Sequence, residues 1–174
     1  MGGHPSGWSL NYKKRIMATT LTNATLTVTL SESVLLRGVE QGSTNTLSIS
    51  SINEVFKQIV TCTTDRNELF AAIASGTDKG SFLEANIRYI RVTNLDDTNH
   101  VVLFFKNESN DEIAVKLDRG QSFIYNADLT GGVVDTMDAN SAGAASSGQL
   151  ADLTNVYAQA DTASVDLEIF VASA

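Results

Sequence analysis

The chain has 174 residues, of which 43% are hydrophobic and 7% aromatic, and its formal net charge at pH 7 is −8. This length is typical of one domain, and a core of Val, Ile, Leu and Thr is typical of β-sheet proteins. The charge is uneven, because from Asn107 onward eleven acids face only Lys116 and Arg119, a local balance of −9. Such a surface repels phosphate backbones, so we expect no nucleic-acid partner and favour contacts with basic or neutral protein surfaces.

The single cysteine, Cys62, excludes an internal disulfide and a multi-cysteine zinc site. No segment approaches the roughly 20 consecutive apolar residues that a membrane-spanning helix needs, and no apolar run near the N-terminus has the pattern of a signal peptide. We therefore expect no membrane partner and a soluble protein that is made in a reducing cytoplasm.

Residues 1–17 differ from the rest, with the only Pro, the only Trp, three bases and no acid. Lys13-Lys-Arg-Ile-Met17 can be encoded by purine-rich codons that resemble a ribosome-binding sequence before a start codon. Residues 1–17 are thus interpreted as a flexible leader, one origin of which is an over-long reading frame that starts before Met17. Loss of the three bases would bring the net charge to −11. A vector-derived leader and an arm that grips a neighbouring subunit are the alternatives.

Residues 18–174 are expected to form a single antiparallel β-sandwich domain with a jelly-roll-like topology. The prediction rests on apolar residues that alternate with polar ones and on Asx- and Gly-rich turns about ten residues apart. Gly120, for example, suits a turn position with positive φ. The expected strands are Ala24–Leu30, Thr46–Ile52, Asn53–Cys62, Ile87–Leu95, Val101–Lys106, Ile113–Leu117, Ser122–Tyr125 and Ser164–Val171.

Three further segments are less regular. Glu68–Ala74 contains good helix formers, so its sequence leaves helix and strand open. Ala139–Gly148 has no side chain larger than Asn and is predicted to be a mobile loop or one that orders only against a neighbour. Gln149–Tyr157 is expected to return to the sheet.

Few residues suggest catalysis. His100, the only histidine outside the N-terminal segment, follows a polar turn, where solvated and turn-capping roles are ordinary. Cys62 ends a strand and is most simply a small buried side chain. No G-x-S-x-G, P-loop or H-E-x-x-H motif occurs. We predict that the protein is not an enzyme and has no catalytic, cofactor-binding or metal-binding residues.

Two groups of side chains carry the oxygen atoms that a calcium site needs. Asp96, Asp97 and Asn99 lack alternating D-x-D spacing and a distal glutamate, so a turn is the favoured interpretation. Asp135 and Asp138, on either side of Met137, are interpreted in the same way.

Two arginines lie on one expected strand. Arg88 and Arg91 have an odd spacing, which places them on opposite faces. They are predicted to pair with the acidic surface rather than to form an anion site.

The central segment Ala85-Asn-Ile-Arg-Tyr-Ile-Arg-Val-Thr-Asn-Leu-Asp-Asp-Thr-Asn99 resembles a recurrent sequence of small all-β virion proteins of tailed bacteriophages. Gly120-Gln-Ser-Phe123 and the closing Thr162–Glu168 are similar to segments of the same proteins. The resemblance is close over residues 85–125 and loose over 47–171, and it includes no catalytic or metal motif.

The resemblance implies a structural protein of the virion. The small size and acidic surface of the chain favour a capsid decoration or cement subunit. Its expected location is the outer capsid surface, its expected partners are the major capsid protein or other virion proteins, and a homo-oligomer is expected. The alternative is a tail, tail-fibre or baseplate component with carbohydrate binding at the host surface. The remaining alternatives are a carbohydrate-binding sandwich and a hydrolase.

Overall fold

The computed structural model describes residues 22–76, 80–138 and 150–174. This part of the chain is built from strands and one short 3-10 helix, η1 (Glu84–Asn86). In chain order the strands are β1 (Ala24–Ser31), β2 (Leu35–Leu36), β3 (Val39–Glu40), β4 (Thr44–Ile52), β5 (Glu54–Cys62), β6 (Asn67–Ile73), β7 (Ser81–Leu83), β8 (Ile87–Asn94), β9 (Val101–Asn107), β10 (Glu112–Leu117), β11 (Ser122–Asn126), β12 (Leu153–Ala160) and β13 (Val165–Ser173).

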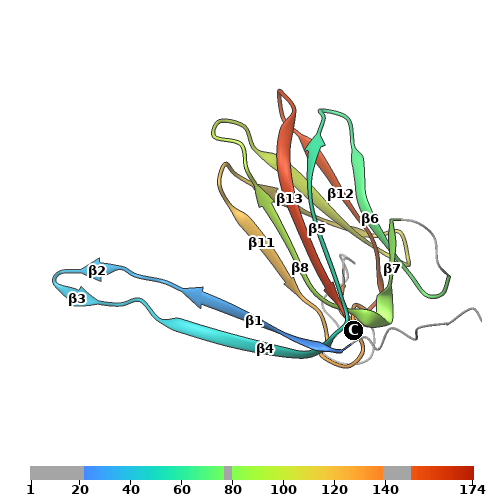
Figure 1. Ribbon diagram of the computed structural model, residues 1–174. Coiled ribbons are helices and arrows are strands. Elements are labelled where there is room, and N and C mark those ends of the chain that lie inside the picture. The colour runs from blue at the N-terminus through green and yellow to red at the C-terminus, as the bar shows by residue number, and fades with distance from the viewer. Residues whose placement is uncertain (1–21, 77–79, 139–149) are drawn as a thin grey trace, which may run out of the picture.

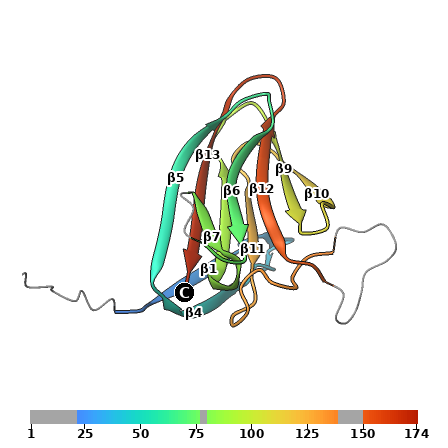
Figure 2. The same ribbon diagram turned by 90° about the vertical axis from the view of Figure 1, so that its right-hand side faces the viewer.

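Two sheets face each other and form a β-sandwich (Figures 1 and 2). One has the order β11-β8-β13-β5 and the other the order β10-β9-β12-β6-β7. Every pairing in the sandwich is antiparallel except that of β7, which runs parallel to β6. The pairs are nested along the chain: β9 pairs with β10, β8 with β11, β6 with β12 and β5 with β13. The predicted antiparallel β-sandwich is confirmed.

The core lies between the sheets and follows the predicted alternation. In β13, Val165, Leu167 and Ile169 have no exposed surface, while Asp166 lies on the outer face. The predicted burial of Cys62 is confirmed, and Ile59, on the opposite face of β5, is exposed. Strands β8, β9 and β12 contribute the other large inward side chains, which include Ile90, Val92, Leu103, Phe105, Leu153 and Val156.

The turns between the central strands also agree with the sequence. Asp96 and Asn99 lie in the turn from β8 to β9, and Gly120 has a φ of +68° before β11. Two buried asparagines at the ends of strands have partners. Asn94 donates to the carbonyls of Asn99 and Leu117, and Oδ1 of Asn107 accepts the backbone N–H of Asp111. Glu68–Ala74, left open by the sequence, is a strand here (β6), because it pairs with β12 and lies against the core.

The first expected strand, Ala24–Leu30, forms as β1, but it does not join the sandwich as predicted. Strand β1 is no part of either sheet of the sandwich; it pairs with β4 alone. These two strands, with β2 and β3 beyond them, make a long hairpin that projects from one end of the sandwich (Figure 1). We call residues 24–52 the arm. The predicted leader, residues 1–17, and the predicted loop Ala139–Gly148 lie outside the described residues.

Candidate functional site

The end of the arm is a tight hairpin. Leu35 pairs with Glu40 and Leu36 with Val39 across the two-residue turn. Both turn residues have positive φ, +53° at Arg37 and +82° at Gly38. This is the conformation of a type I′ turn, whose twist matches that of the strands it joins. The turn therefore fixes the direction in which the side chains at the end of the arm point.

The carboxylate of Glu40 braces this end of the arm. Its Oε1 accepts hydrogen bonds from the backbone N–H of Val34 at 2.9 Å and of Gly42 at 2.8 Å, and Oε2 accepts one from the Ser33 hydroxyl at 3.3 Å. These bonds, that from Val34 first, hold the pKa of Glu40 below its ordinary value. A Cβ on Gly42 would lie 1.9 Å from the carbonyl oxygen of Glu32, so only glycine fits there.

The braced end exposes a set of large apolar side chains. Their exposed fractions are 70% for Leu35, 60% for Leu36, 57% for Val39 and 53% for Val34. Monomeric soluble proteins rarely expose contiguous apolar patches of more than a few hundred Å², and larger ones mark interaction sites. We call these four residues the arm tip.

The root of the arm packs against the sandwich. Ile49 and Ile52 are only 2% and 3% exposed and belong to a second apolar cluster with Tyr89 and Ala172. This cluster lies on the outer face of the sheet β11-β8-β13-β5, where the Tyr89 and Phe170 rings meet edge to face with centroids 6.0 Å apart. The arm is therefore anchored at its root and unsupported beyond it.

An open groove of about 450 Å³ lies in the angle between β1 and this outer sheet face. Its lining is mainly apolar, with Leu26, Thr27, Val28, Thr29 and Leu30 from the arm and Tyr89, Arg91, Ser122, Ile124 and Phe170 from the sheet. We call it the arm groove.

The arm groove contains one charged side chain, and that charge is paired. Arg91 forms an ion pair with Glu168, which also binds Lys57 at 2.9 Å. The hydrogen bonds from Lys57 and Arg91 lower the pKa of Glu168. The prediction that Arg91 pairs with the acidic surface is confirmed.

The same prediction was wrong for Arg88. Its side chain is 8% exposed and donates to backbone carbonyls, to Ala85 at 2.6 Å and to Thr130 at 3.3 Å. Burial of a guanidinium requires such acceptors. The odd spacing separated the two arginines correctly, but nothing in the sequence indicated that residues 127–133 fold back over Arg88.

The structure gives His100 and Cys62 separate partners. Nδ1 of His100 lies 3.5 Å from a carboxylate oxygen of Asp161 at the surface. The thiol of Cys62 is 1% exposed and contacts the Thr63 carbonyl and the Asn67 amide oxygen. Burial raises the pKa of Cys62, which keeps it a thiol rather than a nucleophilic thiolate.

The oxygen-rich groups act in turns. Oδ1 of Asp96 accepts the backbone N–H of Thr98 and Asn99, which lowers the pKa of Asp96. Asp128 does the same for Thr130 and Gly131, and its bonds bring its pKa to about 2. Such Asx turns satisfy the carboxylate without a metal. Among the described residues, no group of three or more His, Cys, Asp or Glu side chains has a metal-binding arrangement.

Asp135 and Asp138 lie in the segment that follows β11. Asp135 has a φ of +51°, and its backbone N–H donates to the Asp152 carboxylate at 2.8 Å. Met137, between them, is buried.

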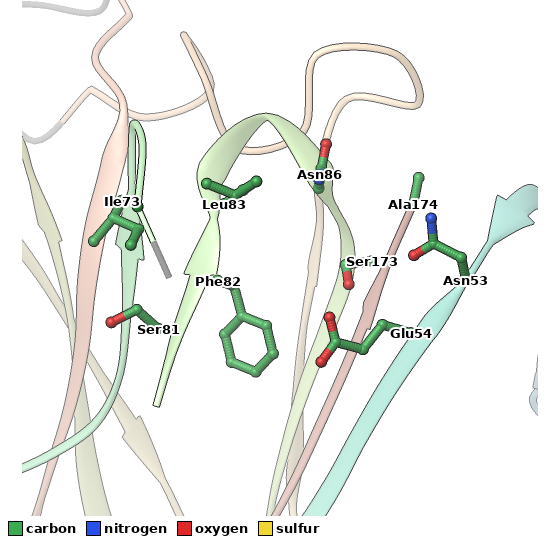
Figure 3. Close-up of a pocket in the computed structure, with 10 residues that line it drawn as sticks. Asn53, Glu54, Ile73, Ser81, Phe82, Leu83, Asn86, Ser173 and Ala174 are labelled. Atoms are coloured by element: carbon green, nitrogen blue, oxygen red, sulfur yellow. The ribbon is translucent and has the colours of Figure 1, made fainter. Parts of the chain in front are cut away.

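A second hollow, of about 360 Å³, lies at the open side of the sandwich between β5 and β7 (Figure 3). Glu54 is the one ionisable side chain among its described lining residues, which also include Asn53, Asn86 and Phe82.

Aromatic side chains on the outer face of the larger sheet are covered. Phe104 and Tyr157 are opposite each other in the pairing of β9 with β12. The guanidinium of Arg66 lies over both rings, 4.3 Å and 4.4 Å from their centroids, and pairs with Glu112. These rings therefore offer no bare platform for stacking a sugar.

The arm tip was missed by the sequence analysis. The signal was present in Val34-Leu-Leu-Arg-Gly-Val39, because a short apolar segment around an X-Gly pair is typical of a hairpin turn. In the described ranges, no helix is long and apolar enough to cross a membrane. No protein-family model matches the chain, and no curated protein has a significant sequence match to it.

Proposed function

We propose that this protein is a structural assembly subunit that acts by adhesion, and that its setting is the capsid surface of a tailed bacteriophage. The observation that carries the adhesive role is the arm tip, which exposes four large apolar side chains on a braced hairpin beyond the body. Such an exposed apolar surface favours association with another protein and has no use in a protein that functions alone. The resemblance of residues 85–125 to small phage virion proteins supports the setting.

The organisation of the sandwich is in keeping with this role. Its nested strand pairs, β5 with β13 outermost and β9 with β10 innermost, support a jelly-roll description. A fold of this kind is used by proteins of many functions, so it does not by itself select one. Within the described residues, the hollows lack paired acid and base groups, which favours binding over catalysis.

A decoration subunit would bind the assembled shell more tightly than free coat protein and thereby stabilise the particle. The acidic body fits the exposed side of such a subunit, because like charges keep neighbouring bodies apart and soluble. The less charged arm fits a side that contacts other subunits of the assembly.

The test is the number of copies per particle. Purified virions of a phage that encodes the chain should contain hundreds of copies by quantitative mass spectrometry, and particles that lack the protein should assemble but release DNA at a lower temperature. Six to a few tens of copies would replace the capsid assignment by the tail or baseplate assignment. Absence from virions would overturn the virion setting altogether.

A further inference from the structure

The chain has two apolar surfaces that its own fold leaves open. One is the arm tip, and the other is the arm groove between β1 and the outer sheet face. The tip does not fill the groove of its own chain, because the arm extends away from the sandwich (Figure 1). Each chain thus offers one projecting apolar element and one apolar depression.

The hairpin itself needs support. Beyond the root, β1, β2 and β3 have no buried residue, and Leu30 and Leu36 are more than half exposed. An isolated two-stranded hairpin is at best marginally stable in water. The type I′ turn and the Glu40 bonds order the tip in advance, which reduces the entropy that binding costs. These features are those of a docking element.

The chemistry of the arm groove suits such an element. Tyr89, Ile124 and Phe170 offer it ring and aliphatic surface, and Arg91 is already neutralised by Glu168. A charged insert would find no free partner there and would lose its hydration. An uncharged apolar insert such as Leu36 would be favoured.

Charge also selects the arm as the meeting surface of two copies. The whole chain has a net charge of −8, whereas residues 24–52 contain only Glu32, Arg37 and Glu40, a balance of −1. Two acidic bodies repel each other. The electrostatic repulsion between two copies is therefore smallest where the contact is made by the arm.

We propose that the partner of the arm is a second copy of this chain: the arm tip of one copy occupies the arm groove of the next. This deepens the adhesive role proposed above by naming what the arm binds, and it rests on that role only for its biological setting. Exchange between copies fills both surfaces on every chain.

The exchange gives a closed assembly if the copies are related by rotation. Each copy then contributes a tip and a groove, so its interface counts both surfaces. Stable interfaces bury about 800 Å² per partner, and both surfaces of each copy contribute to that area in the exchange.

The first experiment measures the mass of the purified full chain by light scattering over a range of concentrations. We expect an oligomer, and we expect the triple substitution Leu35→Ser, Leu36→Ser, Val39→Ser to give a monomer with an unchanged circular dichroism spectrum. The matched control is Val55→Ser with Ile59→Ser, which removes exposed apolar surface from β5 and should leave the oligomer intact.

The second experiment locates the contact. Two differently tagged chains, both with Cys62→Ala, receive Leu35→Cys in one and Ser122→Cys in the other. Under mild oxidation after mixing they should form a disulfide-linked pair of unlike chains. Leu35→Cys mixed with Asp65→Cys, in the distant turn between β5 and β6, should not.

A monomer at every concentration, or an oligomer that the triple substitution leaves unchanged, would overturn the exchange. A monomer that is nonetheless abundant on virions, and needs its tip to bind them, would retain the proposed function and assign the tip to another virion protein. An arm-dependent oligomer that is absent from virions would retain the exchange and reject the virion setting.

Discussion

The body and the arm use the same strand chemistry to opposite effect. In the body, each strand lies in a sheet that faces another sheet, and Leu103, Leu167 and Ile169 have no exposed surface. In the arm, β1 and β4 pair only with each other, and Leu35 is 70% exposed. Alternation of apolar residues therefore stabilises a strand only where a second layer covers it. The body contains its own second layer, whereas the arm has one only at its root.

The sharpest way to break this comparison is to remove matched side chains from the two regions. Leu167→Ala leaves a cavity in the body and should lower the free energy of unfolding by about 2–5 kcal/mol. Leu35→Ala removes no buried contact within the chain and should change it by no more than about 0.5 kcal/mol. Urea unfolding of dilute, monomeric protein measures both. Similar losses at the two sites would show that the tip packs against its own body.

The arm root should separate the two regions. Ile49→Ala removes the buried side chain that joins the arm to Tyr89 and Ala172. Because the arm lies outside the main core, we expect its local opening to become easier while global unfolding changes less than in Leu167→Ala. Hydrogen exchange should quicken in β1 and β4 and stay slow in β13. Equal acceleration in all three strands would mean that arm and body unfold as one unit.

The turn at the end of the arm offers a smaller, stabilising change. Arg37 has a φ of +53°, a conformation that costs a side chain about 1–2 kcal/mol and that Asn tolerates better. Arg37→Asn should therefore slow amide exchange at the tip by a few-fold. Gly38→Ala, at a φ of +82°, should have the opposite effect and serves as the control.

The smallest expected effect is a pH dependence confined to the tip. The pKa of Glu40 is lowered in the folded chain, so the bonds from Val34 and Gly42 contribute stability that is fully present above the ordinary glutamate pKa. This stability is lost as the pH falls through the lowered pKa. The Val34 and Gly42 amides should lose protection in that range, beyond the intrinsic pH dependence of exchange. In Glu40→Gln the protection should be weaker and independent of this titration; a wild-type profile in the variant would assign the titration to another group.

Most strands and turns of the body could be predicted from the sequence, because the patterns that specify them are local. Period-2 alternation in residues 165–171 determines which side chains enter the core, and Asx and Gly residues determine where strands turn. The strand Asn67–Ile73 could not be predicted from the sequence, because it contains helix formers such as Leu69 and Ala71. This segment becomes a strand only when it pairs with β12. Burial of Cys62 followed from its position on the inward side of β5.

The candidate site was harder to predict from the sequence, because it depends on which strands pair and pack together. The sequence of Ala24–Leu30 determines a strand with an apolar side, and the Arg37-Gly38 pair is typical of a hairpin turn, although this turn was not predicted. The sequence does not determine that β1 leaves the sandwich and pairs with β4 alone, nor that Arg88 is enclosed by residues 127–133. Those outcomes were decided by tertiary structure, since β1 pairs with β4 and does not extend the sheet at its edge strand β5. An apolar side chain is the same in either setting, and only the presence or absence of a covering layer makes it core or contact surface.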